Sequence, residues 1–449
     1  MLPRPPDPCP RLHKGFTAVT LVASLAMRWW GPLGLLAAIR VAIPLAAYAD
    51  AGSGLPGMPA FTRSARDGGL SGDATGFYAA TREFMAAWGR MPRAVFALDV
   101  LLALAAAVTI ALLWRGRPTW RPWLVPAAFC TFGLVVSVDV HWMNPSGAAV
   151  FGWPLLWSLP MLAYRALGVG LSKHVAWDFG FALSLLCVAL TVAAVAYLGR
   201  NATGRRWVGL LAAAFWTIWP LLVGVIAGHQ AWANSQWDVD VGLHNYSEPL
   251  STLLVTAGAA LVLSPRLTSM RLSLAGCAFS AATLVKLSNA LLAATALVVV
   301  FLRGRWREAL PYLAGALALA PLVLVYWPIS YPKLFNNPQS WPRDPFNPAH
   351  VVSSWTHSSI FTPHTLAIVA PLAIVGAFAI RRPWALALVL SFLLLNPVFY
   401  SFYANTAQHP RFLYASLPEL FVLWAGAAAF VSDAVVRHLP SRTAVRTST

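Results

Sequence analysis

Two aspartates stand where a carboxylate could accept a proton during a reaction. Asp73 lies in SGDATGFYAATREF, shortly before Tyr78, and Asp139 lies in VVSVDVHWMNPSG, two residues before His141. A positioned carboxylate is a common general base. Each residue also suits a structural role, because Asp73 could cap the start of a helix and Asp139 could anchor a helix end at a membrane interface. From the sequence alone, both roles stay open for both aspartates.

Three basic side chains stand where a phosphate could bind. Lys286 lies within the apolar stretch ATLVKLSNALLA, and His409 and Arg411 precede the last apolar run in QHPRFLYASLPEL. A lysine at membrane depth needs a partner or water and often marks a functional site, and arginine binds phosphate through two parallel hydrogen bonds. The alternative for Arg411 is plain interfacial anchoring. Glu248, followed by proline, is typical of the first turn of a helix.

The proline-rich loop 330–363 combines aromatic and polar residues. Arg343 and Asp344 stand between Trp341 and Phe346, and we expect an ordered, extended loop and not a helix. Aromatic rings can stack on sugar faces while Arg and Asp bond hydroxyl groups, which favours carbohydrate binding. The equally weighted alternative is a rigid lid in which Arg343 pairs with Asp344. The sequence has no P-loop, HExxH, GxSxG or metal-ligand cluster, so no cofactor is predicted, although a divalent metal held jointly with a substrate phosphate stays open.

The composition indicates that these residues are positioned by membrane helices. Of 449 residues, 58% are hydrophobic and 10% are charged, against roughly 25% charged in a soluble domain. The net charge is +17, but the basic residues form short clusters between apolar runs. That distribution argues against a nucleic-acid partner, since a nucleic-acid interface gathers basic residues on one face.

About twelve spans are expected, because crossing the hydrocarbon core takes roughly 20 apolar residues. Two of them are short helices within 272–302, broken near Lys286, Ser288 and Asn289. Segment 148–169 is interrupted by prolines and is expected to be re-entrant or interfacial. We predict tails at 1–29 and 431–449 around one membrane domain, 30–430. The remaining predicted spans are 30–49, 94–114, 122–139, 178–199, 207–228, 246–264, 309–329, 364–380, 384–402 and 412–430.

Basic residues predict the orientation of the chain in a plasma membrane. Alternate short loops carry arginine clusters, for example Arg115, Arg117 and Arg121, whereas loops 50–93, 140–177, 229–245, 330–363 and 403–411 carry few. Basic short loops face the cytoplasm, so both termini are expected inside and the candidate site residues outside. No internal repeat is visible, which counts against an inverted-repeat transporter.

Four segments resemble the GT-C superfamily of membrane glycosyltransferases, whose bacterial branch includes protein O-mannosyltransferase-like enzymes of glycosyltransferase family 39. They are GDATGFYAA after the first span, WPLLWSLPMLAYRALG, the pairing of YSEPLSTLLV with AATLVKLSNALLA, and HPRFLYASLPELFVLWAG. Two departures stand out. Two apparent spans separate Asp73 from the WPLLW segment, where relatives usually have one continuous outer loop, and Asp73 is followed by Ala74 where the family often has an Asp-Glu pair.

The resemblance implies an inverting transfer of a sugar from a polyprenyl phosphate to an acceptor hydroxyl outside the cytoplasm. It implies Asp73 as the base, with Asp139 as the reserve. Candidate contacts to the donor or acceptor are Tyr78, Lys286, Trp341, Arg343, Asp344, His409 and Arg411. The acceptor would be an envelope glycan, lipid or protein. Two alternatives are a transporter or flippase of a lipid-linked intermediate and a non-enzymatic membrane partner of an envelope assembly complex.

Overall fold

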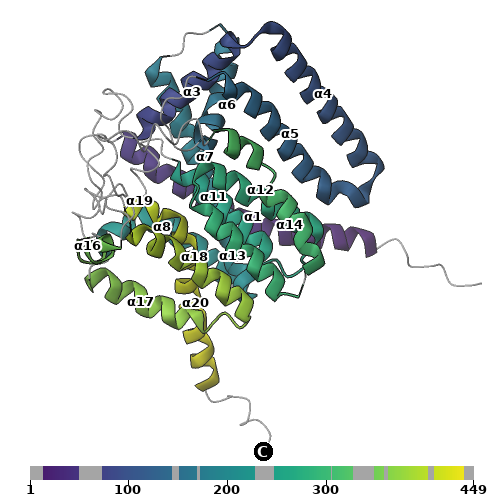
Figure 1. Ribbon diagram of the computed structural model, residues 1–449. Coiled ribbons are helices and arrows are strands. Elements are labelled where there is room, and N and C mark those ends of the chain that lie inside the picture. The colour runs from purple at the N-terminus through teal and green to yellow at the C-terminus, as the bar shows by residue number, and fades with distance from the viewer. Residues whose placement is uncertain are drawn as a thin grey trace, which may run out of the picture.

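The computed structural model describes residues 14–49, 73–143, 151–168, 172–227, 247–304, 306–326, 348–357, 363–402 and 409–438. Within these ranges every regular element is a helix (Figure 1). The first half contains α1 (Lys14–Ala49), α3 (Asp73–Arg90), α4 (Arg93–Gly116), α5 (Arg121–His141), α6 (Gly152–Ala166), α7 (Lys173–Thr203) and α8 (Arg206–Ala227). The second half contains α11 (Glu248–Val262), α12 (Ser269–Val285), α13 (Asn289–Leu302), α14 (Ala309–Ala316), α16 (Ala349–His357), α17 (Pro363–Ala377), α18 (Pro383–Ser401), α19 (His409–Phe412) and α20 (Leu417–His438).

The helices have the composition of a membrane protein. Among the described residues, seven helical segments are long and apolar enough to cross a membrane, and five shorter helices are also apolar. Many large apolar side chains are exposed on the outside of the bundle, among them Leu101, Leu112 and Phe378. Such a surface is stable only in an apolar solvent such as lipid. The full set of twelve spans stays a prediction.

Two local predictions are confirmed and two boundaries differ. The break at Lys286–Ser288 separates α12 from α13 as expected, and a helix, α3, begins at Asp73, where the sequence suits a helix start. The helix α1 begins at Lys14, inside the predicted tail, and α20 continues to His438. The expectation of a helix-free loop 330–363 is wrong for Ala349–His357, which forms α16. The reason is local, because the prolines of that loop all precede Ala349 except Pro363, so nothing within α16 breaks a helix.

Close helix crossings hold the bundle together where side chains are smallest. At the α17–α20 crossing, a side chain at Gly426 would meet the main-chain oxygen of Gly376 at 2.8 Å. At the α12–α14 crossing, a side chain at Gly276 would meet the main-chain nitrogen of Ala316 at 2.7 Å. Small residues allow membrane helices to approach closely and to gain packing energy that the surrounding lipid does not supply.

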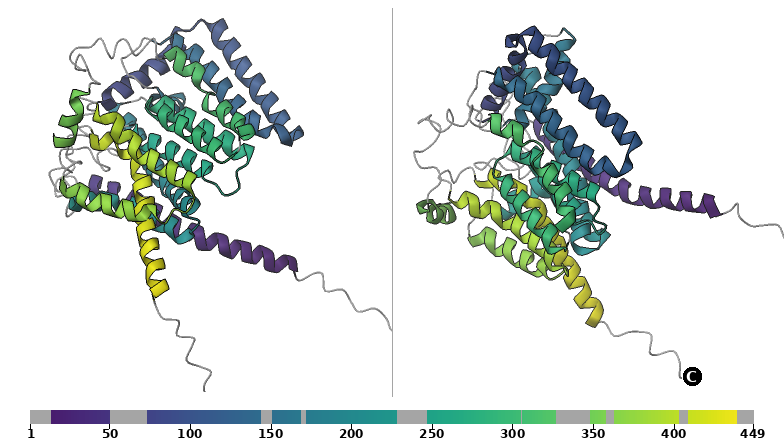
Figure 2. Two further views of the ribbon diagram at one scale, coloured as in Figure 1. Left: turned by 60° about the horizontal axis from the view of Figure 1, so that its bottom comes forward. Right: turned by 45° about the vertical axis from the view of Figure 1, so that its right-hand side comes forward.

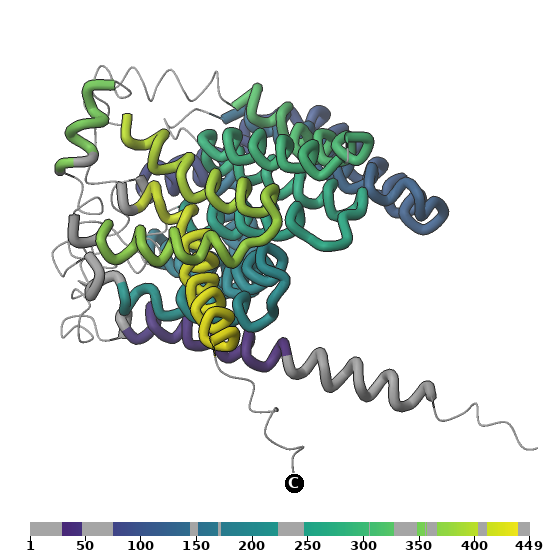
Figure 3. The backbone as a smooth tube through the Cα atoms, turned by 90° about the horizontal axis from the view of Figure 1, so that it is seen from below, coloured from purple at the N-terminus to yellow at the C-terminus, as the bar shows by residue number. Residues whose placement is uncertain are grey.

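The hairpin of α4 and α5 lies at the edge of the molecule. It is dark blue in Figures 1, 2 and 3, and in each view it borders the rest of the bundle on one side only. Only 6% of the α4 span is buried, whereas half of the α7 span is buried. The helix α4 packs mainly on α5.

The loops that carry arginine clusters meet at one end of the bundle. Arg205, between α7 and α8, pairs with Asp433 near the end of α20, and Arg303 after α13 bonds the main-chain oxygen of Val262 at the end of α11. The Arg303 guanidinium also lies 4.2 Å from the Trp384 ring centre at the start of α18. We call this face the basic end. The basic loops described here thus share one side, as the charge pattern predicts, and which side faces the cytoplasm stays a prediction.

Candidate functional site

A buried carboxylate holds two of the predicted phosphate-binding residues together. The Glu248 Oε1 atom lies 2.8 Å from the Lys286 ammonium and accepts a hydrogen bond from Arg411 Nε at 2.5 Å. The side chains of Glu248, Lys286 and Arg411 are only 2%, 13% and 6% exposed. We call these three residues the Glu248 cluster. Their positions in the sequence are far apart, so only the fold brings both cations to one oxygen.

The Glu248 cluster lies where several helices begin. Glu248 is the first residue of α11, and Lys286 immediately precedes the turn that starts α13. Arg411 belongs to α19, just before α20. Helix starts present unpaired main-chain N–H groups and a partial positive charge. The α11 start stabilises Glu248, and the α13 start adds positive potential beside the two cations.

The helix break at Lys286 is stabilised by Asn289. Its side-chain amide donates to Ser251 Oγ on α11 and to the main-chain oxygen of Ala282 on α12, both at 2.8 Å. Lys286 itself has an extended backbone, with φ −148° and ψ 121°. The extended residue turns the Lys286 side chain away from the α12 axis and toward Glu248. Irregular backbone at membrane depth occurs where it is buried in protein or lines a polar cavity.

Aromatic rings form the other wall around Lys286. Its ammonium lies 4.8 Å from the Phe412 ring centre and 5.9 Å from that of Tyr400. The two rings stack at 4.4 Å, and the Tyr400 hydroxyl is 3.0 Å from Ser288 Oγ. Ring faces attract a cation without neutralising it. Lys286 therefore lies between a carboxylate and a pair of rings.

The helix α6 lies against the same break, and α3 packs on α6. Gly152, the first residue of α6, is so close to α12 that a Cβ atom there would lie 2.9 Å from the main-chain nitrogen of Val285, the residue before Lys286. Thr81 of α3 donates to the main-chain oxygen of Pro154 at 3.3 Å. The segment predicted to be re-entrant or interfacial is a helix of 15 residues that packs beside the Glu248 cluster. Its position relative to a membrane stays a prediction.

Two of the predicted residues belong to α3. Asp73 is the first residue of α3, which is the position of a capping residue or of the residue next to it. The Asp73 side chain lies outside the described part of the structure. Tyr78 is buried, and its ring centre lies 6.0 Å from that of Trp157 on α6. The structure therefore makes Tyr78 part of the α3–α6 contact, and its predicted role with a substrate stays a prediction.

Asp139 lies apart from the cations. It is buried near the end of α5, where the Trp88 side chain hydrogen-bonds it and Asp99 is close enough to repel it. Among the described residues Asp139 has no ion-pair partner. The buried apolar cluster at this place includes Val140 and Leu284. This surrounding is less suited to a reaction beside a bound phosphate than the Glu248 cluster is.

Four predicted residues have side chains outside the described part of the structure. Trp341, Arg343 and Asp344 lie outside the described residues, and His409 is described only by its backbone in α19. Within the described ranges, no group of three or more His, Cys, Asp or Glu residues could hold a metal ion.

Sequence reasoning assigned Glu248 only a local role at a helix start. That role is confirmed, because Glu248 opens α11 with Pro249 beside it. What it missed is the pairing with Lys286 and Arg411, which depends on the tertiary packing of α11, α13 and α19. A usable signal was present: three isolated ionisable residues at the predicted outer ends of spans, where each needs a partner.

Chemically, the Glu248 cluster is suited to hold an anionic group. Two cations share one carboxylate oxygen, so a phosphate could accept hydrogen bonds from both without either moving far. The carboxylate fixes their directions before a ligand arrives, and such preorganisation lowers the cost of binding. Comparison of the chain with protein-family models, with curated proteins and with solved structures gave no match.

Proposed function

We propose that the protein is a membrane glycosyltransferase that uses a polyprenyl-phosphate sugar as its donor. The observation that carries the proposal is the convergence of Lys286 and Arg411 on Glu248 beside the start of α13. A lipid phosphate at the mouth of a helix bundle needs cations that stay charged while partly out of water. The resemblance of the surrounding segments to GT-C enzymes supplies the reaction class.

In the proposed reaction the acceptor hydroxyl oxygen attacks the anomeric carbon of the sugar. The bond from that carbon to the phosphate oxygen breaks, and the hydroxyl proton passes to a carboxylate. Asp73 is the proposed base and Asp139 the reserve, since Asp139 lacks a cationic neighbour among the described residues. The departing lipid phosphate is a weak base that needs no acid, so Lys286 and Arg411 would stabilise its charge.

A membrane assay with a labelled polyprenyl-phospho-sugar tests the proposal. Asp73→Asn is expected to lower transfer about 10²–10⁴-fold, the range for a lost general base. Asp139→Asn is expected to keep activity, and Lys286→Met to raise the KM for the donor. The exposed Lys173 serves as the matched control, and Lys173→Met should change nothing. Normal transfer by the Asp73→Asn, Asp139→Asn double variant would remove this mechanism.

A transporter of a lipid-linked intermediate is the second candidate. It is favoured by buried polar groups on α11 and α20: the side-chain oxygens of Thr252, Thr256 and Glu419 are buried without a hydrogen-bond partner within the described residues. Such groups are expensive in a membrane interior and often line a path for ions or substrates. Counterflow of unmodified substrate across proteoliposomes, with no covalent transfer, would favour this candidate over the first.

A further inference from the structure

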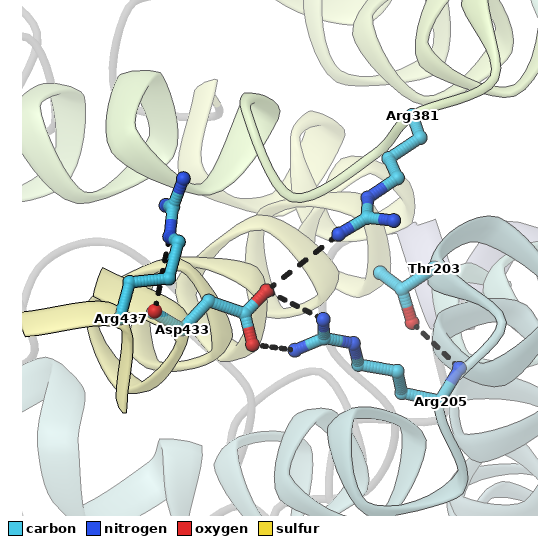
Figure 4. A network of polar contacts seen from close by, with 5 residues as sticks. All are labelled: Thr203, Arg205, Arg381, Asp433 and Arg437. Atoms are coloured by element: carbon cyan, nitrogen blue, oxygen red, sulfur yellow. Dashed lines mark hydrogen bonds and ion pairs between the residues drawn. The ribbon is translucent and has the colours of Figure 1, made fainter. Parts of the chain in front are cut away.

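A second charged site lies at the basic end of the bundle, on the opposite ends of the helices from the Glu248 cluster. The last turns of α20, the turn that follows α17 and the loop between α7 and α8 line an open cavity of about 480 Å³. Figure 4 shows arginines from these three segments beside Asp433: Arg205 and Arg381 approach its carboxylate, and Arg437 bonds its main-chain oxygen. The cavity belongs to no part of the proposed transfer reaction.

The arginines outnumber the carboxylate. Arg205 binds Asp433 with both of its terminal nitrogens, at 2.9 and 2.5 Å, and this hydrogen bonding raises the pKa of Arg205. Arg381 lies 4.0 Å from the same carboxylate and its side chain is 82% exposed. Arg437 donates from Nε to the main-chain oxygen of Asp433 at 3.2 Å. Asp433 therefore neutralises one guanidinium, and within the described residues Arg381 and Arg437 keep N–H donors for an anion.

The other half of the lining is apolar. Phe378 and Val436 border the cavity, and each is 68% exposed. A free phosphate ion would gain nothing from these side chains. A phospholipid would use both halves, because its headgroup phosphate meets the arginines while its acyl region covers Phe378 and Val436.

The cavity walls are held in place by the packing described above. The α17–α20 crossing at Gly376 and Gly426 fixes the two helices just before they reach the cavity. Asp433 ties the α7–α8 loop to α20 through Arg205. The three basic side chains thus come from elements whose mutual positions are set before any lipid binds.

We propose that this cavity binds the headgroup of an anionic phospholipid in the leaflet that borders the basic end. Basic pockets between membrane helices are a recurrent form of lipid recognition, and each Arg near such a surface contributes about a five-fold gain in affinity for anionic lipid. The cavity selects phosphatidylglycerol over phosphatidylcholine, since the latter carries a compensating positive charge.

Native mass spectrometry of the full chain in detergent, titrated with each lipid, measures the affinity for the first bound lipid molecule. Phosphatidylglycerol is expected to bind more tightly than phosphatidylcholine. Arg381→Gln and Arg437→Gln should each weaken phosphatidylglycerol binding about five-fold, and the pair about 25-fold. Arg117→Gln removes one exposed arginine from the α4–α5 loop and leaves the cavity intact, so it should retain the affinity of the unaltered chain.

Equal affinity for the two lipids would overturn the proposal, as would an equal loss in Arg117→Gln and Arg381→Gln. Competition with millimolar inorganic phosphate distinguishes a lipid site from a phosphate site. If it displaces phosphatidylglycerol completely, the cavity is a phosphate site and the lipid assignment is wrong. Retained lipid binding in phosphate, together with the loss in the double variant, supports the lipid headgroup.

Discussion

The central residue of the molecule is a buried glutamate whose two partners arrive from distant segments. Removing a charged group from water costs several kcal/mol, and only close partners offset that cost. Glu248 has two, Lys286 and Arg411. Lys286 and Arg411 in turn depend on Glu248, because without its negative charge the two cations would repel each other in a region of low dielectric constant.

Glu248→Gln is therefore expected to destabilise the protein strongly. Loss of one member of a buried ion pair costs about 3–5 kcal/mol. Thermal unfolding of the full chain in detergent measures the effect. Glu83→Gln is the matched control, since its pair with Arg90 has side chains 29% and 42% exposed and should contribute less than about 1 kcal/mol.

The double variant Glu248→Gln, Lys286→Met separates charge pairing from simple loss of packing. It removes one cation along with the carboxylate, so part of the lost stability should return. A double variant no more stable than Glu248→Gln alone would show that repulsion between Lys286 and Arg411 is not the cause.

For single residues, the sequence predicts which side chains belong to the candidate site better than it predicts which side chains they contact. Lys286 is predicted because an isolated charge in apolar surroundings is costly, and Arg411 because a cation at the entrance of a span can bind a lipid phosphate. Neither argument needs a structure. Glu248 was given its helix-start role only, since a following proline explains it locally. Which side chains meet depends on how α11, α13 and α19 pack, and no local pattern carries that information.

At the scale of elements, the contact between α6 and the α12 break links the candidate site to the rest of the bundle. Gly152 permits the contact because it has no side chain. Gly152→Leu is expected to lower stability by about 1–3 kcal/mol, the usual cost of overpacking, and to displace α12 beside Lys286. Thermal unfolding measures the loss of stability, and the KM for the donor measures the effect of displacing α12.

Gly34→Leu is the control for that substitution. A side chain at Gly34 of α1 would meet nothing within 4 Å, and leucine is a better helix former than glycine. The control is expected to be neutral or slightly stabilising. Equal losses for Gly34→Leu and Gly152→Leu would contradict the close contact between α6 and α12.

The lengths of the apolar runs predicted most described helices, and the polar residues between α12 and α13 predicted that this pair is broken. The prediction failed at α16, where a proline-rich start to the loop concealed a proline-free stretch of helix. It also left α6 undecided between an interfacial and a re-entrant segment. Helix length and hydropathy describe one element at a time, and the place of α6 depends on its neighbours.

At the scale of the whole molecule, the basic loops share one end, which predicts a single orientation in the membrane. In a cysteine-free background, Arg206→Cys at the basic end should react with a membrane-impermeant maleimide only after the cells are lysed. Lys173→Cys, at the other end of α7, should react in intact cells. Both positions are exposed. The reverse pattern would place the Glu248 cluster in the cytoplasm and contradict the proposed donor side.

The lightly packed α4–α5 hairpin makes the molecule responsive to bilayer thickness. With 24 residues, α4 is about 36 Å long, which exceeds a hydrocarbon core of roughly 30 Å. Such a mismatch is relieved by tilting. Because α4 rests mainly on α5, it can tilt without disturbing the crossings of α12, α17 and α20. Thinner and thicker membranes would then change the inclination of α4 against α5 while the arrangement around Lys286 stays constant.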